Sequence, residues 1–431
     1  ADVSQQLEGL KKIVNINDIS QTYNLATAAE YKDFATAFPV GKVVYLADRD
    51  AEFTVIAGTG TGNNTNIIAS ASVSQSVSYI MQRDILAKSM GVVGDDVNDD
   101  TNAILAAIGL LSSFGGGRVI FNPDDICKIT SVLTIPNRVT IDLNGGARIN
   151  QHSNDVNIIS FSSALAGSAR QQIINGRLSY NTQQTTVAGS AVLLADATTV
   201  TTRWLLSNLS ISKAYHSTYI PDGADTYLAS MKDVTSTDSD DYAFYFGGGA
   251  SVHTNIKLSN IWAFQTPGAE RAGSRGFSLQ NIQELDADNL AVDNCQGIPL
   301  QILTCKGVIS NIAIESCERV IPASFGYHVG VFNSHISIGT LLATANDVTL
   351  SGSGSLALLY TDQGSNVNVF TITDNDTTLV DTSSGSYHTI FSVNAEDRVW
   401  NKRAISSDGS PAISINDTSD NSPKRVRELN G

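Results

Sequence analysis

The chain has 431 residues, 42% of them apolar and 16% charged, and its net charge is −15. The apolar share is enough for a sizeable core, whereas the acidic balance and the lack of a basic stripe argue against nucleic-acid binding. No stretch is apolar for long enough to cross a bilayer, and nothing at the start reads as a signal peptide, so no membrane insertion is expected. Because the chain begins at Ala1, we expect that an N-terminal piece carrying targeting or attachment information is missing.

Composition and cysteine spacing favour a turn-dense β protein without a metal. Asn, Ser, Thr, Asp and Gly are abundant, and Lys and Glu are few. The four cysteines form no CxxC pair and stand at no zinc-ligand spacing from a histidine. We therefore predict neither a metal site nor a cofactor.

Residues 1–87 come first in the chain and are predicted to form a small α/β head domain. The segment "ATAAEYKDFATAF" suits a helix, and "GKVVYLA" and "EFTVIAG" suit short strands. A second helix is predicted near residues 99–113, within "GDDVNDDTNAILAAIGLLSSFGGG". Asp99, Asp100 and Thr101 offer N-capping oxygens, and apolar residues follow at helical spacing. These apolar residues are Ile104, Leu105, Ile108 and Leu111.

Nearly the same six letters then recur along the middle of the chain, as "SNLSIS", "KDVTST", "SNIWAF", "DNLAVD" and "SNIAIE". Their first apolar residues lie 22 to 29 positions apart, and "SHISIG" supplies a sixth copy anchored on Ile336. The other anchors are Leu209, Val234, Ile261, Leu290 and Ile312. Period-two alternation predicts a strand with one buried face, and regular return predicts stacked coils. The variable period argues against leucine-rich and hexapeptide repeats, and we predict a right-handed parallel β-helix over residues 88–345.

Two copies, "NLAVDNCQGI" and "NIAIESCERV", align for ten residues without a gap. They place Leu290 on Ile312 and Cys295 on Cys317. We predict that these cysteines are buried thiols, with a disulfide as the alternative because stacked Cα atoms are close enough for one. The position before each strand is occupied by a small amide or acid able to bond the neighbouring coil. These residues are Asn208, Asp233, Asn260, Asn289 and Asn311.

The segment "KSMGVVGDDVNDDTNAILAAI…GGGRVIFNP" resembles the N-terminal motif of pectate-lyase-like β-helices, known from bacteriophage tailspikes and from pectin- and alginate-active enzymes. Asp96 stands where the family commonly has glycine. The resemblance implies a right-handed parallel β-helix whose exposed end the helix near 99–113 would cap. It also implies a homotrimer, attached to a virion tail or baseplate through the missing N-terminal part and acting outside the host cell.

Residues 346–431 contain short β runs between Ser, Gly, Asp and Thr, such as "LALLYTDQ" and "VNVFTITD". We predict a separate C-terminal β-structured module, for trimerisation or carbohydrate contact. Its last residues, "SDNSPKRVRELNG", read as a tail.

Candidate catalytic residues are acids at equivalent positions of successive coils. Asp293 and Glu315 occupy one position in consecutive copies, and Glu318 follows three residues later. Asp238 and Asp241 follow an earlier strand, within "TSTDSDDYAFYF". Glycoside hydrolysis needs two carboxyl groups about 5–9.5 Å apart, and close like charges raise the pKa of one of them. The alternative interpretation is that these acids are solvated turn residues.

Candidate substrate-binding residues are aromatic or charged side chains near these acids. They are Tyr215, His216, Tyr242, Tyr245, Trp262, Glu270, Arg271 and Arg275. Aromatics such as Trp262 and Tyr245 could equally be packing residues, and His216 is expected in a groove or on the surface rather than as a base.

The leading hypothesis is a tailspike-like depolymerase that binds and hydrolyses a bacterial capsular or O-antigen polysaccharide. A lyase acting by β-elimination is the alternative chemistry; it would need a basic side chain and a neutralised uronate, and basic residues are few in the coils. A polysaccharide-binding adhesin without chemistry and a purely structural fibre are the alternatives of other classes.

Overall fold

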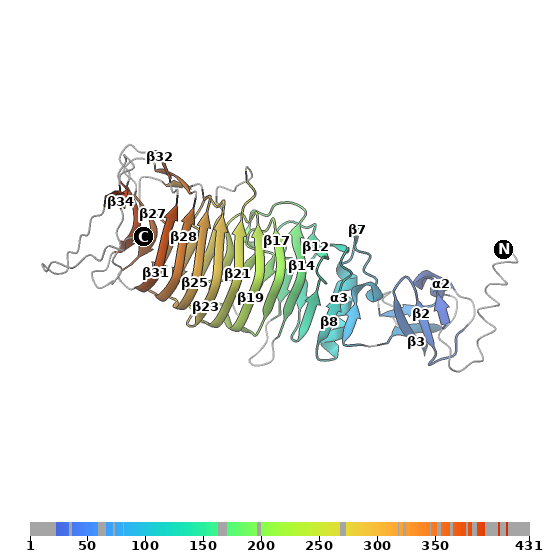
Figure 1. Ribbon diagram of the computed structural model, residues 1–431. Coiled ribbons are helices and arrows are strands. Elements are labelled where there is room, and N and C mark those ends of the chain that lie inside the picture. The colour runs from blue at the N-terminus through green and yellow to red at the C-terminus, as the bar shows by residue number, and fades with distance from the viewer. Residues whose placement is uncertain are drawn as a thin grey trace.

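The computed structural model describes the chain from residue 23 to residue 412 with gaps (Figure 1). The described ranges are 23–33, 37–58, 66–71, 74–80, 82–162, 170–195, 200–267, 273–317, 319–321, 325–344, 346–350, 355–362, 365–375, 378–381, 386–392, 404–405 and 411–412. No helix within these ranges is long and apolar enough to span a membrane.

The N-terminal part forms a five-stranded sheet with one short helix. The strand order is β1-β2-β3-β5-β4, and the helix is α2 (Ala28–Asp33). The strands are β1 (Tyr23–Leu25), β2 (Val43–Leu46), β3 (Ala51–Ala57), β4 (Ile67–Ala69) and β5 (Gln75–Tyr79). Alternate side chains such as Val44, Phe53 and Val77 are fully buried in a core separate from that of the coils. The helix and the two strands expected near residues 26–58 are therefore present.

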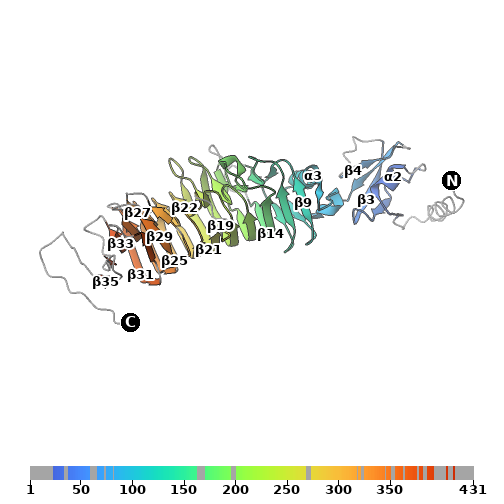
Figure 2. The same cartoon turned by 90° about the horizontal axis from the view of Figure 1, so that it is seen from above.

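Most of the chain winds into a right-handed parallel β-helix, seen from the side in Figure 1 and from above in Figure 2. Two long sheets run along it. Sheet 1 has the order β31-β28-β25-β23-β21-β19-β17-β14-β11-β8-β6, and sheet 2 has the order β10-β13-β15-β18-β20-β22-β24-β27-β30-β33-β34-β35. A third, short sheet has the order β26-β29-β32.

Sheet 1 consists of β6 (Asp84–Leu86), β8 (Gly117–Ile120), β11 (Val139–Asp142), β14 (Gln172–Tyr180), β17 (Leu205–Ser212), β19 (Asp225–Thr237), β21 (His253–Phe264), β23 (Leu285–Asp293), β25 (Lys306–Glu315), β28 (His335–Thr344) and β31 (Asn366–Asn375). Four strands join it off this path: β7 (Asp95–Asp99), β9 (Ile126–Ile129), β12 (Arg148–Gln151) and β16 (Val200–Thr202).

Sheet 2 consists of β10 (Leu133–Ile135), β13 (Ile159–Phe161), β15 (Val192–Leu193), β18 (Thr218–Ile220), β20 (Tyr242–Phe246), β22 (Arg275–Gln280), β24 (Leu300–Leu303), β27 (Phe325–Phe332), β30 (Ser355–Thr361), β33 (Ser386–Ser392), β34 (Ala404–Ile405) and β35 (Pro411–Ala412). The third sheet consists of β26 (Arg319–Ile321), β29 (Asp347–Leu350) and β32 (Thr378–Asp381). Two short 3-10 helices are η1 (Ala87–Met90) and η2 (Val187–Gly189).

The first coil is covered by α3 (Thr101–Ser113), which confirms the predicted helix. Ile104, Ile108 and Leu111 face the coil and are buried. The carboxylate of Asp99 accepts hydrogen bonds from the Thr101 N–H and hydroxyl. The carboxylate of Asp100 makes no capping bond to the helix and accepts instead from the Val93 and Gly94 N–H groups, at 2.7 and 3.1 Å. These acids therefore shape the helix start and the preceding turn.

Strand register confirms the repeat for five of its six copies. Leu209 pairs with Val234, Val234 with Ile261, Ile261 with Leu290, and Leu290 with Ile312. The sixth anchor was wrong, because Ile336 pairs with Gly307, whereas Leu341 pairs with Ile312. Each long strand of sheet 1 contains two straight segments that both alternate apolar and polar residues, and "SHISIG" belongs to the first segment of β28.

The residues before the repeated strands form a ladder of side-chain amides. Asn311 donates to Asn289, Asn289 to Asn260, and Asn260 to Asp233, over 2.8 to 2.9 Å. Asn289 has a φ of 55°, in the left-handed region that Asn tolerates better than most residues. The ladder thus marks the bend between the two straight segments of each strand.

This ladder gives a prediction for Asn289. Replacing Asn289 with glycine keeps the left-handed backbone but removes the amide bonds, and should lower the unfolding free energy by about 1 kcal/mol. Replacing it with alanine should lower it by about 1–2 kcal/mol more, because a Cβ strains this backbone. Guanidinium unfolding midpoints of the two variants measure the difference. Equal midpoints would contradict a role for the left-handed bend.

The ladders continue past residue 345. Strand β28 pairs in parallel with β31, and β30 pairs with β33, which ends at Ser392. The predicted boundary between the coils and a separate module at 346–431 therefore does not coincide with a break in sheet 1 or sheet 2. The predicted tail lies outside the described residues.

Candidate functional site

The first candidate site is a pair of carboxylates on the outside of sheet 1. Asp293 ends β23, Glu315 ends β25, and the two residues are paired across the strands. Val292 and Ile314 are buried, so the alternation turns both acids outward. Glu315 is exposed and Asp293 is partly buried. Adjacent strands are about 4.8 Å apart, which places the two carboxyl groups side by side as the sequence predicted.

Burial and the Glu315 carboxylate raise the pKa of Asp293, in that order of importance, and the Asn294 N–H opposes them. Burial withdraws water from the charged form, and the neighbouring negative charge disfavours it further. The two acids consequently have unequal surroundings, because Glu315 reaches solvent. Unequal surroundings of this kind allow one acid of a pair to act as proton donor and the other as carboxylate.

Aromatic rings continue this row of outward side chains. Phe264 is the strand neighbour of Asp293 in β21, and the ring of Trp262 lies 5.4 Å from that of Phe264. Trp262 is 42% exposed, a high value for such a large apolar side chain. The two rings form an aromatic surface that ends at the Asp293 carboxyl group. The sequence predicted Trp262 but missed Phe264, although period two from Trp262 in "IWAF" indicates it.

The second candidate cluster lies at the start of β20 and β22 in sheet 2. Arg275 forms an ion pair with Asp241 at 3.4 Å, and its guanidinium lies 4.9 Å from the centre of the Tyr242 ring. The Tyr215 hydroxyl donates to Asp241 at 3.3 Å. The Tyr242 hydroxyl donates to Gln301 at 2.7 Å, and burial raises the pKa of Tyr242 to about 12. Four residues predicted for substrate binding or catalysis are thus brought together.

His216 belongs to the packing of this cluster. Its ring stacks on Tyr219 at 5.0 Å and on Tyr245 at 5.3 Å, and Nδ1 donates to the Tyr242 carbonyl oxygen at 2.6 Å. His216 is only 3% exposed, so the expected groove or surface position was wrong. Burial lowers the pKa of His216, which keeps the imidazole neutral. The Tyr245 hydroxyl donates to Asp222.

Of the remaining predicted residues the structure describes Asp238, which follows β19 and whose N–H donates to the Phe264 carbonyl oxygen at 3.0 Å. The Asp238 carboxylate accepts hydrogen bonds from the Thr266 N–H at 2.8 Å and hydroxyl at 3.0 Å, which is the work of a turn acid. Glu318, Glu270 and Arg271 lie outside the described residues. All four cysteines are buried and unbridged, and the Cys295 and Cys317 sulfurs lie 3.2 Å apart, which confirms buried thiols at that position.

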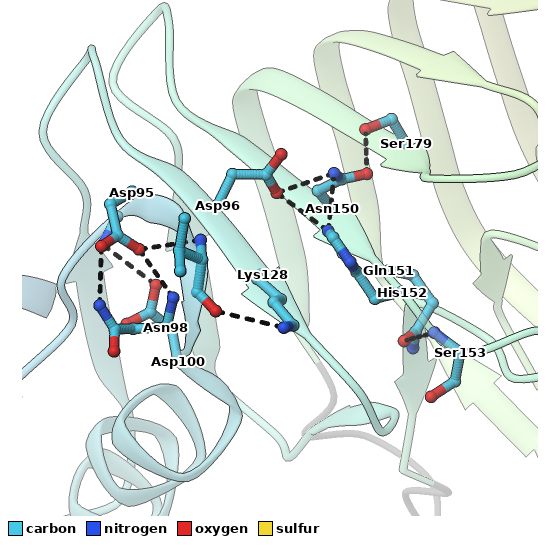
Figure 3. Close-up of polar contacts among 12 residues, drawn as sticks. Asp95, Asp96, Asn98, Asp100, Lys128, Asn150, Gln151, His152, Ser153 and Ser179 are labelled. Carbon is cyan, nitrogen blue, oxygen red and sulfur yellow. Dashed lines mark hydrogen bonds and ion pairs between the residues drawn. The ribbon is translucent and has the colours of Figure 1, made fainter.

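A polar network missed by sequence reasoning lies at the N-terminal end of sheet 1 (Figure 3). The Asn150 amide donates to Asp96 at 2.9 Å, and the Ser179 hydroxyl donates to the Asn150 oxygen at 3.0 Å. His152 Nε2 lies 3.0 Å from the Asp96 carboxylate. Asp96 itself has a φ of 60°, so it adopts the backbone for which the resembling motif uses glycine. The presence of Asp96 at a position where the motif commonly has glycine was the only feature of the sequence that pointed to this network.

Comparison with known proteins gives a likeness of fold. No protein-family model and no curated protein matches the sequence. A tailspike of Acinetobacter phage vb_AbaP_AS12 is similar over 95% of this chain and 79% of its own, with 12% identity and a TM-score of 0.55. Tailspike protein 2 of bacteriophage CBA120 is similar over 86% of this chain and 59% of its own, with 11% identity and a TM-score of 0.45. A tailspike of Acinetobacter baumannii bacteriophage Fri1, a capsular polysaccharide depolymerase, is similar over 84% of this chain and 76% of its own, with 10% identity and a TM-score of 0.41. The chain therefore shares the right-handed parallel β-helix fold of phage tailspikes.

Proposed function

We propose that this chain is a tailspike-like depolymerase that hydrolyses a bacterial surface polysaccharide at Asp293 and Glu315. The observation that carries the proposal is the paired position of these acids in unequal surroundings, with Phe264 beside Asp293 and the exposed ring of Trp262 next to Phe264. The long outer face of a β-helix suits an extended polymer. The fold shared with a phage tailspike is consistent with this role.

In the proposed mechanism Asp293 is the proton donor. Its raised pKa keeps more of it protonated, and it protonates the glycosidic oxygen as the bond to the anomeric carbon breaks. Glu315 is the ionised partner. Retaining glycosidases have their carboxyl groups about 5–5.5 Å apart, close to the spacing of neighbouring strands at about 4.8 Å, so Glu315 is proposed as a nucleophile. Trp262 and Phe264 would hold the neighbouring sugar ring by stacking.

The proposed setting is a homotrimer on a phage tail, acting on the host from outside. The resemblance of about residues 88–150 to the tailspike motif supports this setting. Light scattering of the whole chain tests it, and a monomer mass would remove the trimer from the proposal.

The deciding experiment is analysis of the cleavage products in water enriched with oxygen-18. Hydrolysis puts the heavy oxygen into each new reducing end and produces no double bond. A new C=C absorbance would instead identify a lyase. Burial raises the pKa values of both Tyr215 and Tyr242, which makes the phenols of the second cluster poor bases for elimination. Binding of glycan without any shortening of the polymer would support the adhesin.

A further inference from the structure

A groove near the first coils is lined by cations and lies away from the proposed catalytic pair. It has a volume of about 430 Å³ and lies over β12, β14 and β17 of sheet 1. Its wall includes Arg148, Arg177 and Lys213, and the hydroxyls of Ser210 and Ser212 also line it. Arg148 and Arg177 are direct strand partners, so two guanidinium groups start from backbone positions about 4.8 Å apart.

This stacking of like charges is unusual for a chain with a net charge of −15. Like charges directly opposite each other destabilise a sheet. Two other arginines have acids beside them: Arg118 pairs with Asp84 and Asp142, and Arg275 pairs with Asp241. Within the described ranges neither Arg148, Arg177 nor Lys213 forms an ion pair. Asp96 is the acid among the lining residues; it interacts electrostatically with Arg148, and its carboxylate is bonded to Asn150 and His152.

The floor of the groove is polar and largely buried. Asn150 is 5% exposed and Ser179 is 8% exposed, and both belong to the network with Asp96. Asp96 has a φ of 60°, in the left-handed region that Asp adopts more readily than most residues, and its side chain is held by Asn150 and His152. Buried polar floors with fixed donors and cations at the rim are typical of sites that recognise a polar ligand.

We propose that this groove is a subsite for carboxylate-bearing sugar residues, which makes the substrate an acidic polysaccharide. The proposal rests on the proposed function in that the same polymer would extend along sheet 1 to Asp293. A guanidinium group binds a carboxylate through two parallel N–H donors, and two such groups in register match acidic residues of an extended chain. The serine hydroxyls and the ammonium of Lys213 complete the set of donors to the sugar.

The test is a calorimetric titration of the full chain carrying Glu315→Gln, which keeps the glycan intact, with a hexamer of galacturonic acid. The matched ligand is the same hexamer with its carboxyl groups reduced to alcohols. We expect binding of the acidic hexamer only, weakened at least 10-fold by R148Q/R177Q and weakened by salt. R148K/R177K keeps the positive charges but removes the forked guanidinium donors. Its affinity for the acidic hexamer should fall between those of R148Q/R177Q and of the chain with both arginines.

The control variant is Lys232→Gln, an exposed cation of the same sheet that already faces Asp233 at 4.0 Å, and it should bind unchanged. Equal binding of the reduced hexamer, unchanged affinity in R148Q/R177Q, or no binding of the acidic hexamer would each overturn the subsite. Thermal unfolding of R148Q/R177Q checks its fold, and an unchanged or higher Tm is expected as the like charges are removed. Cleavage that survives in Asp293→Asn would overturn the catalytic pair and leave the groove standing.

Discussion

Replacing Asp293 with asparagine is expected to lower the rate of polysaccharide cleavage about 10²–10⁴-fold, the usual contribution of a general acid. The amide keeps the shape of the side chain and cannot supply the proton. Release of new reducing ends measures the rate. The matched control is Asp288→Asn, an exposed acid on the same strand, which should cleave at the original rate.

Asp293→Asn should leave the unfolding free energy unchanged or raise it at neutral pH. Because the pKa of Asp293 is raised in the folded chain, the folded state holds this proton more tightly than the unfolded state does. The contribution of Asp293 to stability therefore falls as pH rises from the unfolded pKa through the higher folded pKa. Asparagine removes this loss. A large fall in Tm for Asp293→Asn at neutral pH would contradict the assignment.

Glu315 should influence the titration of Asp293 directly. Glu315→Gln removes one of the two causes of the raised pKa, and the pKa of Asp293 should move down toward its usual range, although burial remains. Carbon-13 NMR of the Asp293 carboxyl group follows this change. An unaltered titration would mean that the two side chains do not face each other in solution.

The sequence predicted the coils because the core repeats along the chain. Leu290 and Ile312 could be aligned since both must fill the same interior at successive levels, and a shift by one residue would turn polar side chains inward. The alignment failed at Ile336 because both segments of a long strand carry the same alternation. Period alone does not distinguish the segments; the amide ladder at the bend does.

The candidate site was predictable only where coils repeat well. Asp293 and Glu315 lie in the two most similar copies, so their pairing followed from the alignment. Arg148 and Arg177 lie before the first recognisable copy, and their partnership appears only from the register of β12 and β14. The burial of His216 was missed because it depends on tyrosines of two coils closing over the ring. Side-chain direction at turns is not encoded in a period.

The largest loss of stability is expected from shortening a buried ring between coils. Phe244 is fully buried and stacks on Phe277 of the next coil, with ring centres 5.0 Å apart and planes at 15°. Its strand partners are Thr218 on one side and Phe277 on the other. Phe244→Ala should lower the unfolding free energy by about 3–5 kcal/mol, because it leaves a cavity that three successive coils line.

Each coil of a solenoid contacts mainly its neighbours, so the damage should be local. Hydrogen exchange of Phe244→Ala should show faster exchange in β18, β20 and β22, with α3 and β12 protected as before. Trp262→Ala is the matched control, since this ring is 42% exposed on the outer face and its removal should leave exchange in these strands unchanged. Uniform loss of protection along the whole solenoid would instead mean that the coils unfold as one cooperative unit.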